Sequence, residues 1–332
     1  MKFRPFLLLT TLVLVLVGLV AAAAQDAAFP VTIEHKFGST TITEAPQRVV
    51  SIGFSEQDPL LALGIMPVAV RYWYGDENDP IFPWADEAAQ DGEAPVVLNM
   101  EFGNLNYEAI LSLAPDLIVA LYSGITEEEY QTLSEIAPTI AQSADFVDFG
   151  MPWQEQTLTI GAAVGKSEEA AALVSEVEAQ VAAAAEAHPE FVGKSIAVAY
   201  SFPEGYGYYT AQDPRGRFFT DLGFVVPDEL IEVAGESYYA NLSAERLDLL
   251  DQDLLVFVGL QFAEGGREAI ESDPLIRQLS AVKEGRIFYV PADVDDALQF
   301  STVLSLPYAV EGIVPELEAI FPGEGAASEA AS

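Results

Sequence analysis

The sequence of 332 residues contains no cysteine. This absence excludes a structural disulfide, a thiol nucleophile and a cysteine that could carry a lipid anchor. The chain must therefore be held together by its hydrophobic core. With 51% hydrophobic residues, its length predicts about two domains, each large enough to bury a sizeable core.

Histidine is almost as scarce, because only His35 and His188 are present. Neither lies near a candidate nucleophile in the sequence, and we expect both to be solvated surface residues. With so few imidazoles and no thiolate, a zinc or manganese site made of protein ligands is not expected. The acidic run 293–296 lacks the glycine of a calcium-binding loop, so it predicts a solvated turn.

Basic residues are also few. Fourteen lysines and arginines stand against 52 acidic residues, which gives a formal net charge of -38. Nucleic acid and anionic membrane surfaces are therefore poor partners. The acidic residues are scattered and not grouped in blocks, which favours a general role in solubility, in a salty medium for example, over an acidic recognition surface.

Long apolar runs are absent except at the start of the chain. Lys2 and Arg4 precede an apolar run that ends in alanines, an order typical of a secretory signal peptide over residues 1–24. An uncleaved anchor from Phe6 to Ala24 remains open. We expect an exported protein that is secreted, periplasmic or held at the cell surface.

A short pattern occurs twice in the chain. In the first cassette, residues 104–108 (Asn-Leu-Asn-Tyr-Glu) lead to residues 116–119 (Asp-Leu-Ile-Val). In the second cassette, residues 241–245 (Asn-Leu-Ser-Ala-Glu) lead at the same spacing to residues 253–256 (Asp-Leu-Leu-Val). Each copy has a polar N-cap residue, apolar residues at helical spacing and a short apolar run, which predicts a helix followed by a buried strand.

Two similar units predict an α/β protein with two Rossmann-like lobes and a ligand cleft between the lobes. Between them, Ser167 to Ala187 predicts one long alanine-rich helix that would span roughly 30 Å and join the lobes. The expected layout is a signal peptide (1–24), an N-terminal α/β lobe (29–150), linking helices (151–190), a C-terminal α/β lobe (191–322) and a disordered tail (323–332).

Aromatic residues follow several of the predicted strands. Trp73 and Tyr74 follow the second predicted strand, Tyr122 follows the strand of the first cassette, and Tyr206 and Tyr208 follow the first strand of the C-terminal lobe. In open α/β sheets, ligands bind beyond the carboxyl ends of the strands. Rings and phenol groups in these loops suit a large, flat or aromatic ligand; the alternative for each ring is packing between the lobes.

Arginine is scarce, yet four arginines lie in or beside these loops. Cations at a cleft capture an anionic ligand by bidentate hydrogen bonds, and screening over about 8 Å keeps distant acids from cancelling them. For each arginine alone, a structural salt bridge is the alternative, and the clustering with aromatic residues favours binding. The predicted ligand-binding residues are Arg71, Trp73, Tyr74, Tyr122, Tyr206, Tyr208, Arg215, Arg217 and Arg267.

Several stretches of the chain together resemble the substrate-binding proteins of iron-siderophore ABC importers, whose relatives also bind cobalamin or haem. The resemblance covers nearly all of the chain from Phe29 to Phe321. The stretches are residues 48–53 (Arg-Val-Val-Ser-Ile-Gly), 61–70 (Leu-Ala-Leu-Gly-Ile-Met-Pro-Val-Ala-Val), 113–119 (Leu-Ala-Pro-Asp-Leu-Ile-Val), 136–139 (Ile-Ala-Pro-Thr), 217–224 (Arg-Phe-Phe-Thr-Asp-Leu-Gly-Phe) and 279–287 (Leu-Ser-Ala-Val-Lys-Glu-Gly-Arg-Ile).

The resemblance implies two α/β lobes joined by one long helix, a ligand held between them and docking onto a membrane permease. In this family a glutamate on each lobe contacts arginines of the permease. Motif position assigns this role to Glu108 in the first cassette and to Glu236 on the second lobe, in preference to Glu245. The chain departs from many Gram-positive relatives in having no lipid-bearing cysteine.

We therefore expect a monomeric, exported and non-catalytic protein that binds a ferric siderophore and delivers it to an ABC importer permease. No cofactor and no direct protein ligand to the metal are expected, because the iron arrives already chelated. Haem or cobalamin as the ligand of the same fold is the nearest alternative. A secreted hydrolase that uses a pair of cleft carboxylates, or a cell-surface adhesion module, are alternatives from other classes.

Overall fold

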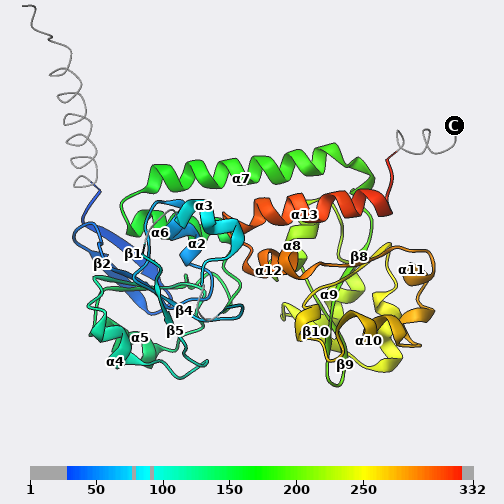
Figure 1. The fold of residues 1–332 in the computed structure, drawn as a ribbon, viewed down its shortest axis with the longest axis horizontal. Helices are drawn as coiled ribbons and strands as arrows, with labels where there is room; N and C mark the ends of the chain where they lie inside the picture. Colours follow the sequence, from blue (N-terminus) through cyan, green and yellow to red (C-terminus); the bar gives the residue numbers. More distant parts are fainter. Residues whose placement is uncertain (1–27, 77–79, 90–92, 324–332) are drawn as a thin grey trace, which may run out of the picture. The chain divides into compact units, whose positions relative to one another are not determined.

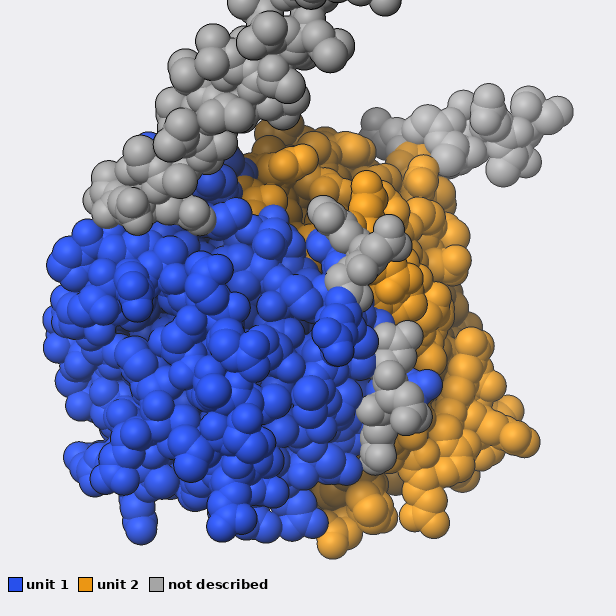
Figure 2. Space-filling model, turned by 60° about the vertical axis from the view of Figure 1, so that its left-hand side comes forward, with its two compact units in different colours: residues 1–81, 88–151, 155–172 blue, residues 82–87, 152–154, 173–332 orange. Residues whose placement is uncertain are grey.

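The computed structural model describes residues 28–76, 80–89 and 93–323, and the described chain divides into two compact units (Figures 1 and 2). Of the described residues, unit 1 comprises those within 1–81, 88–151 and 155–172, and unit 2 comprises those within 82–87, 152–154 and 173–332. The predicted signal peptide and the tail from residue 324 onward lie outside the described residues.

Unit 1 contains a parallel five-stranded sheet with the order β5-β4-β3-β6-β7 and a separate antiparallel pair, β1 and β2. All residues of the central strands β3 and β6 are buried, as expected for parallel strands covered on both faces. The elements are β1 (Val31–His35), β2 (Gly38–Ile42), β3 (Val49–Ser51), α2 (Gln57–Ala62), β4 (Ala69–Arg71), β5 (Val96–Leu98), α4 (Tyr107–Ser112), β6 (Leu117–Ala120), α5 (Glu127–Ser134) and β7 (Thr139–Ala141).

Unit 2 contains a mixed five-stranded sheet with the order β10-β9-β8-β11-β12, in which β9 is antiparallel to both of its neighbours. The elements are the 3-10 helices η1 (Pro83–Ala85), η2 (Pro189–Phe191), η3 (Ala244–Leu250), η4 (Leu260–Phe262) and η5 (Ile276–Gln278), the strands β8 (Ile196–Phe202), β9 (Gly205–Tyr209), β10 (Tyr239–Leu242), β11 (Leu254–Phe257) and β12 (Ile287–Tyr289), and the helices α8 (Pro214–Asp221), α9 (Asp228–Ala234), α10 (Gly266–Ser272), α11 (Ser280–Lys283), α12 (Ala292–Phe300) and α13 (Ser305–Ile320). The α/β class with two sheet-bearing units is thereby confirmed.

Three helices carry residues of both units: α3 (Asp86–Ala89), α6 (Trp153–Ala163) and α7 (Ser167–Ala187). The predicted helix from Ser167 to Ala187 is confirmed, and it begins in unit 1 and continues beyond Ala172 into unit 2 (Figure 1). In the part of the chain that the structure describes, every helix is either too short or too polar to cross a membrane.

The two cassettes fold differently at their helices. In the first, the side chain of Asn106 accepts a hydrogen bond from the amide of Ala109 and caps α4 as predicted. In the second, the predicted α-helix is wrong: the segment is the 3-10 helix η3, and Ser243 makes no capping hydrogen bond to any described residue. Asn241 pairs with Gly207 of β9, so the chain enters this segment from a strand and not from a free turn.

The aspartate at the end of each cassette has the same role in both units. Asp116 accepts hydrogen bonds from the amides of Gln47 and Arg48, both at 2.8 Å, just before β3. Asp253 accepts a hydrogen bond of 2.9 Å from the amide of Ser195, just before β8. Each aspartate therefore satisfies backbone donors that the strand ladder leaves unpaired, and ties a cassette strand to its parallel neighbour.

Two sequence expectations about polar residues are wrong. His35 is buried, with its ring Nε2 3.0 Å from the Thr40 hydroxyl, and desolvation lowers its pKa. His188 is half-buried, and its Nδ1 lies 2.9 Å from Glu190 Oε1. The acidic run 293–296 is not a solvated turn but lies in α12, where Asp295 is fully buried. Amphipathic helices can bury one acid among exposed ones, a feature that local composition does not reveal.

Replacing Asp116 by alanine removes both acceptors before β3 and leaves two backbone amides to water. We expect the free energy of unfolding to fall by about 1 kcal/mol, since the site is exposed. Urea denaturation measures the change, and Asp116→Asn, which keeps one acceptor oxygen, should lose less. Glu135→Ala at an exposed position is the control; identical unfolding midpoints for Asp116→Ala and Glu135→Ala would contradict this role.

Candidate functional sites in the two units

Arg71 ends β4 and lies at the carboxyl edge of the unit 1 sheet. Its side chain is buried, its Nε donates to the carbonyl of Met100 at 3.1 Å, and its Nη2 donates to the carbonyl of Glu101 at 2.9 Å. The guanidinium lies over the ring of Phe54, 4.5 Å from its centroid. Desolvation lowers the pKa of Arg71, yet the pKa of an arginine starts so high that the group remains a cation.

Five rings in contact with one another, of which Phe54 lies over the guanidinium of Arg71, form what we name the unit 1 aromatic cluster: Phe54, Trp73, Tyr74, Tyr122 and Phe149. The ring of Trp73 is central, with its centroid 4.8 Å from Tyr74, 5.3 Å from Phe54 and 6.4 Å from Tyr122. Phe149 lies 5.1 Å from Tyr122 in an edge-on arrangement. The structure thus brings together four of the residues predicted for unit 1, namely Arg71, Trp73, Tyr74 and Tyr122.

Two members of the cluster were missed by sequence reasoning. Phe54 follows β3, and its position after a strand was a signal that could have found it. Phe149 follows no strand directly and adopts a positive φ of 63°, a backbone state that is uncommon for a bulky residue. No local pattern points to it, because only the tertiary fold places it against Tyr122.

Arg215 lies in the first turn of α8 and is the centre of the unit 2 arginine cluster, which we define as Tyr209, Asp213, Arg215, Asp295 and Gln299. The carboxylate of Asp213 accepts hydrogen bonds of 2.7 Å from both Nε and Nη2 of Arg215, and also caps the helix. Nη1 donates to the side-chain oxygen of Gln299 at 2.6 Å. The guanidinium is therefore held as a rigid, planar group.

Arg215 lies over the first of two tyrosine rings that contact each other. The guanidinium carbon of Arg215 lies 3.7 Å from the centroid of the Tyr209 ring, which in turn lies 4.7 Å from the ring of Tyr200. The hydroxyl of Tyr200 donates to Asn241 at 2.6 Å. Tyr200 and Tyr209 both have raised pKa values, chiefly because burial disfavours the phenolate, so they remain neutral hydrogen-bonding groups.

The other residues predicted for unit 2 have partners of their own. Tyr208 is fully buried and donates to the carbonyl of Leu230 at 2.6 Å, so the structure gives its ring no exposed surface. Tyr206 donates to Asp273 at 2.9 Å. Arg217 donates to the carbonyl of Gln212 at 2.9 Å, and the exposed Arg267 forms an ion pair of 2.7 Å with Glu271. Their assignment as ligand-binding residues stays a prediction.

Tyr206 and Tyr208 lie on a strand that the sequence reading did not identify. The segment Gly-Tyr-Gly-Tyr-Tyr forms β9 and pairs with both β8 and β10. The ring of Tyr200 occupies the space beside Gly207, where a Cβ would lie 2.3 Å from it. The glycine therefore marks close packing of an aromatic ring within the sheet, and not a loop that faces a ligand.

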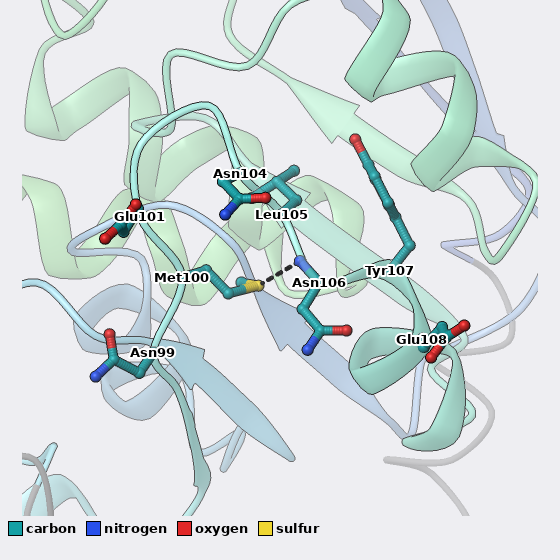
Figure 3. Close-up of a pocket in the computed structure, with 8 residues that line it drawn as sticks. All are labelled: Asn99, Met100, Glu101, Asn104, Leu105, Asn106, Tyr107 and Glu108. Atoms are coloured by element: carbon teal, nitrogen blue, oxygen red, sulfur yellow. Dashed lines mark hydrogen bonds between the residues drawn. The ribbon is translucent and has the colours of Figure 1, made fainter.

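The predicted docking residue Glu108 lies in the first turn of α4 and is exposed. It borders a hollow of about 610 Å³ between the chain after β5 and the start of α4, shown in Figure 3. Glu236 is also exposed and follows α9. The residues that line the hollow are Asn99, Met100, Glu101, Asn104, Leu105, Asn106, Tyr107 and Glu108.

Among the residues that the structure describes, there is no group of three or more histidine, aspartate or glutamate side chains with the geometry of a metal site. The two clusters instead combine a cation with aromatic rings, which is a set of groups for contacting an organic anion.

Comparison with known proteins places the chain among relatives of known class. A family model described as periplasmic binding protein matches residues 57–294. The ferric-anguibactin-binding protein FatB of Vibrio anguillarum is 26% identical over 307 residues, which cover 86% of this chain and 87% of FatB.

Two solved structures are similar in both sequence and fold. A periplasmic solute binding protein from Mycobacterium smegmatis has 33% identity and a TM-score of 0.77, and the match covers 88% of this chain and 98% of that one. PiaA of Streptococcus pneumoniae, solved in complex with ferrichrome, has 31% identity and a TM-score of 0.74, with 87% and 98% covered. The chain therefore belongs to the periplasmic binding protein family, whose members similar to it are non-enzymatic substrate-binding proteins of siderophore and iron-chelate ABC transporters.

Proposed function

We propose that this protein binds a ferric siderophore outside the cytoplasm and delivers it to the permease of an ABC importer. The observation that carries the proposal is that each unit has an arginine stacked on an aromatic ring beside the carboxyl ends of its strands. Family membership and the names of its relatives support the same class of ligand. Because the family is non-enzymatic, the hydrolase alternative is not retained.

The two arginines contribute differently to the capture of an anionic chelate. Arg215 is oriented before binding by Asp213 and Gln299, so little side-chain entropy is lost when a ligand arrives. Arg71 is buried beneath the ring of Phe54 and donates to backbone carbonyls, so it acts through its positive field. A field from a partly desolvated cation is screened less than that of the scattered surface acids.

The aromatic rings complement these charges. Trp73 and its neighbours offer ring faces and edges for the organic rim of a chelate, and the phenol of Tyr122 offers a polar group in the same cluster. The transported iron is already enclosed by the chelating molecule, so the protein contacts that molecule. The same rings would also suit haem or cobalamin, which makes these two compounds necessary members of any ligand panel.

Export and delivery complete the proposal. Residues 1–24 direct the chain out of the cytoplasm, with or without later cleavage, and Glu108 and Glu236 contact arginines of the permease. Both glutamates are exposed, as docking requires. An exposed carboxylate contributes little to folding, so its removal should affect transport alone.

Trp73 should report ligand binding directly. Titration of the wild type with ferric enterobactin, ferrichrome and ferric citrate should show saturable quenching of tryptophan fluorescence with at least one of them. Trp73→Phe should lose most of that quenching, whereas Trp84→Phe, which alters the aromatic group around Phe82 and Phe300, should retain it. If only haem or cobalamin gives a saturable response, that compound and not a siderophore is the ligand. If none of the compounds gives a response, the proposal is refuted.

Arg215 should matter more than any exposed arginine. Arg215→Gln removes the cation beside Tyr209, and we expect the dissociation constant to rise roughly 30-fold or more, about 2 kcal/mol. Isothermal titration calorimetry measures the change, with the melting temperature recorded to identify loss of folding. Arg246→Gln, at an exposed ion pair with Glu229 and outside the predicted ligand-binding residues, should bind within twofold of the wild type. Equal affinities for the two variants would remove Arg215 from the site.

Transport should depend on the two docking glutamates while binding does not. In cells that express the cognate permease, Glu108→Ala and Glu236→Ala should each slow uptake of the ⁵⁵Fe-labelled chelate, and the double variant should nearly abolish it. Ligand affinity measured on the purified variants should be unchanged. Glu135→Ala serves as the control; uptake by the double variant at the rate of this control would exclude the assignment.

A further inference from the structure

Glu56 is a buried acid that the site described above does not use. It precedes α2, follows the chain that leaves β3, and is 0% exposed. A carboxyl group in such a position is costly to bury, so its contacts must compensate for the water that it has lost. Its neighbours in the sequence include Phe54, a member of the unit 1 aromatic cluster.

The carboxyl group of Glu56 connects two loops at the carboxyl edge of the sheet. Its Oε1 accepts a hydrogen bond of 2.7 Å from the amide of Tyr122, which follows β6. Its Oε2 accepts one of 3.3 Å from the amide of Ser55, which follows β3. Beside it, the amide of Phe54 donates to the carbonyl of Tyr122 at 3.2 Å. Two rings of the aromatic cluster are thus attached to the backbone that this one carboxyl group holds.

The carboxyl group of Glu56 occupies the space that a side chain at Gly53 would fill. A Cβ at this position would lie 1.7 Å from Oε1 and 1.8 Å from Oε2 of Glu56, which no real contact allows. The need for glycine here comes from close approach of a side chain and not from a left-handed backbone conformation. Gly53 and Glu56 therefore act as a pair, because a side chain at the first position would displace the carboxyl group of the second.

The charge of Glu56 raises the pKa of Arg71, which ends the neighbouring strand β4. Glu129 of α5 acts on the same arginine, and α5 also carries Glu127, Glu128 and Tyr130. The phenol of Tyr122 and the buried Asp58 of α2 are the titratable groups on the elements that adjoin Glu56 directly. Desolvation raises the pKa of Glu56 to about 7, although its backbone hydrogen bonds lower it. The carboxyl group is consequently neutral at mildly acidic pH and ionises in the physiological range.

We propose that Glu56 is a positioning residue of the ligand site, which holds the loops after β3 and β6 together and so places Phe54 over Arg71 and both Phe54 and Tyr122 against the ring of Trp73. The inference rests on the proposed function for its effect on ligand binding, but the placement of the rings is a property of the protein alone. When Glu56 ionises, its charge offsets that of Arg71, so an anionic ligand is bound more weakly. Anion binding and protonation of Glu56 therefore favour each other.

The first test needs no ligand. In a parent protein that carries Trp84→Phe and Trp153→Phe, Trp73 is the single tryptophan and its emission reports on the cluster. We expect its emission intensity to titrate with a midpoint near pH 7, and Glu56→Gln, an uncharged side chain of the same shape, to remove this titration. Glu56→Ala should shift the Trp73 spectrum at every pH while circular dichroism remains native.

The second test measures affinity for ferric enterobactin, an anionic probe, at pH 6 and pH 8.5. From pH 6 to pH 8.5, the dissociation constant of the wild type should rise at least fivefold more than that of Glu56→Gln. The comparison with Glu56→Gln corrects for titration of the ligand itself. Failure of the wild type to bind this probe or any other chelate would refute the proposed function, whereas the ligand-free titration would still decide the role of Glu56.

The proposal is overturned by any of three results. One is a Trp73 titration that persists in Glu56→Gln, another is its absence from the parent, and the third is a folded Glu56→Ala protein with the parent's spectrum. If Glu56→Ala does not fold, Gly53→Ala takes its place, because it displaces the carboxyl group and should shift the Trp73 spectrum in the same way.

Discussion

Parallel pairing of β3 with β4 and β6 determines where the functional part of unit 1 can form. The strands end at the same edge of the sheet, so the residues that follow them meet there, although they lie far apart in the sequence. Beyond the last ladder hydrogen bond, however, backbone amides in a water-poor environment need new acceptors. Glu56 supplies them for Ser55 and Tyr122, and the rings carried by that backbone take their positions accordingly.

In both units, a buried carboxyl group accepts a hydrogen bond from the backbone amide that follows a central strand. In unit 2, the buried Asp295 accepts a hydrogen bond of 2.8 Å from the amide of Gly259, which closely follows β11. Burial raises the pKa of Asp295, and Arg215 attracts its charged form. Since β6 and β11 are the strands of the two cassettes, each cassette strand is followed by a backbone amide that donates to a buried acid near an arginine. The two cassettes are therefore alike not only in sequence but also in the arrangement of amide, buried acid and arginine at the ends of their strands.

The strongly acidic composition does not conflict with binding of an anion. Most of the described acids lie at exposed positions, where water and salt screen them within about 8 Å. Arg71 and Arg215, in contrast, lie among aromatic rings that exclude water and lower the local dielectric constant. A few cations in such places have more influence on a bound ligand than many distant surface carboxylates, while the net charge keeps an exported protein soluble.

The sequence by itself determined the features that depend on local pattern. Apolar runs predicted the central strands, alanine content and acidic first-turn residues predicted α7 from Ser167 to Ala187, and Asn106 predicted a helix cap. It also predicted that Arg71, Trp73, Tyr74 and Tyr122 would follow strands and gather, because parallel strands expose their carboxyl ends on one edge. These inferences need only periodicity, capping and topology.

Tertiary structure alone decided which side chains are desolvated and what each one contacts. Tyr208 and Tyr122 both belong to tyrosine-bearing segments near strands, yet the first is a core residue of β9 and the second a member of the aromatic cluster. The second cassette forms a 3-10 helix that follows β10, whose pairing with β9 is a long-range contact that the local pattern does not reveal. Glu56, Asp295 and Phe149 gave no local signal, since burial, hydrogen-bond partners and pKa depend on segments that are distant in the chain.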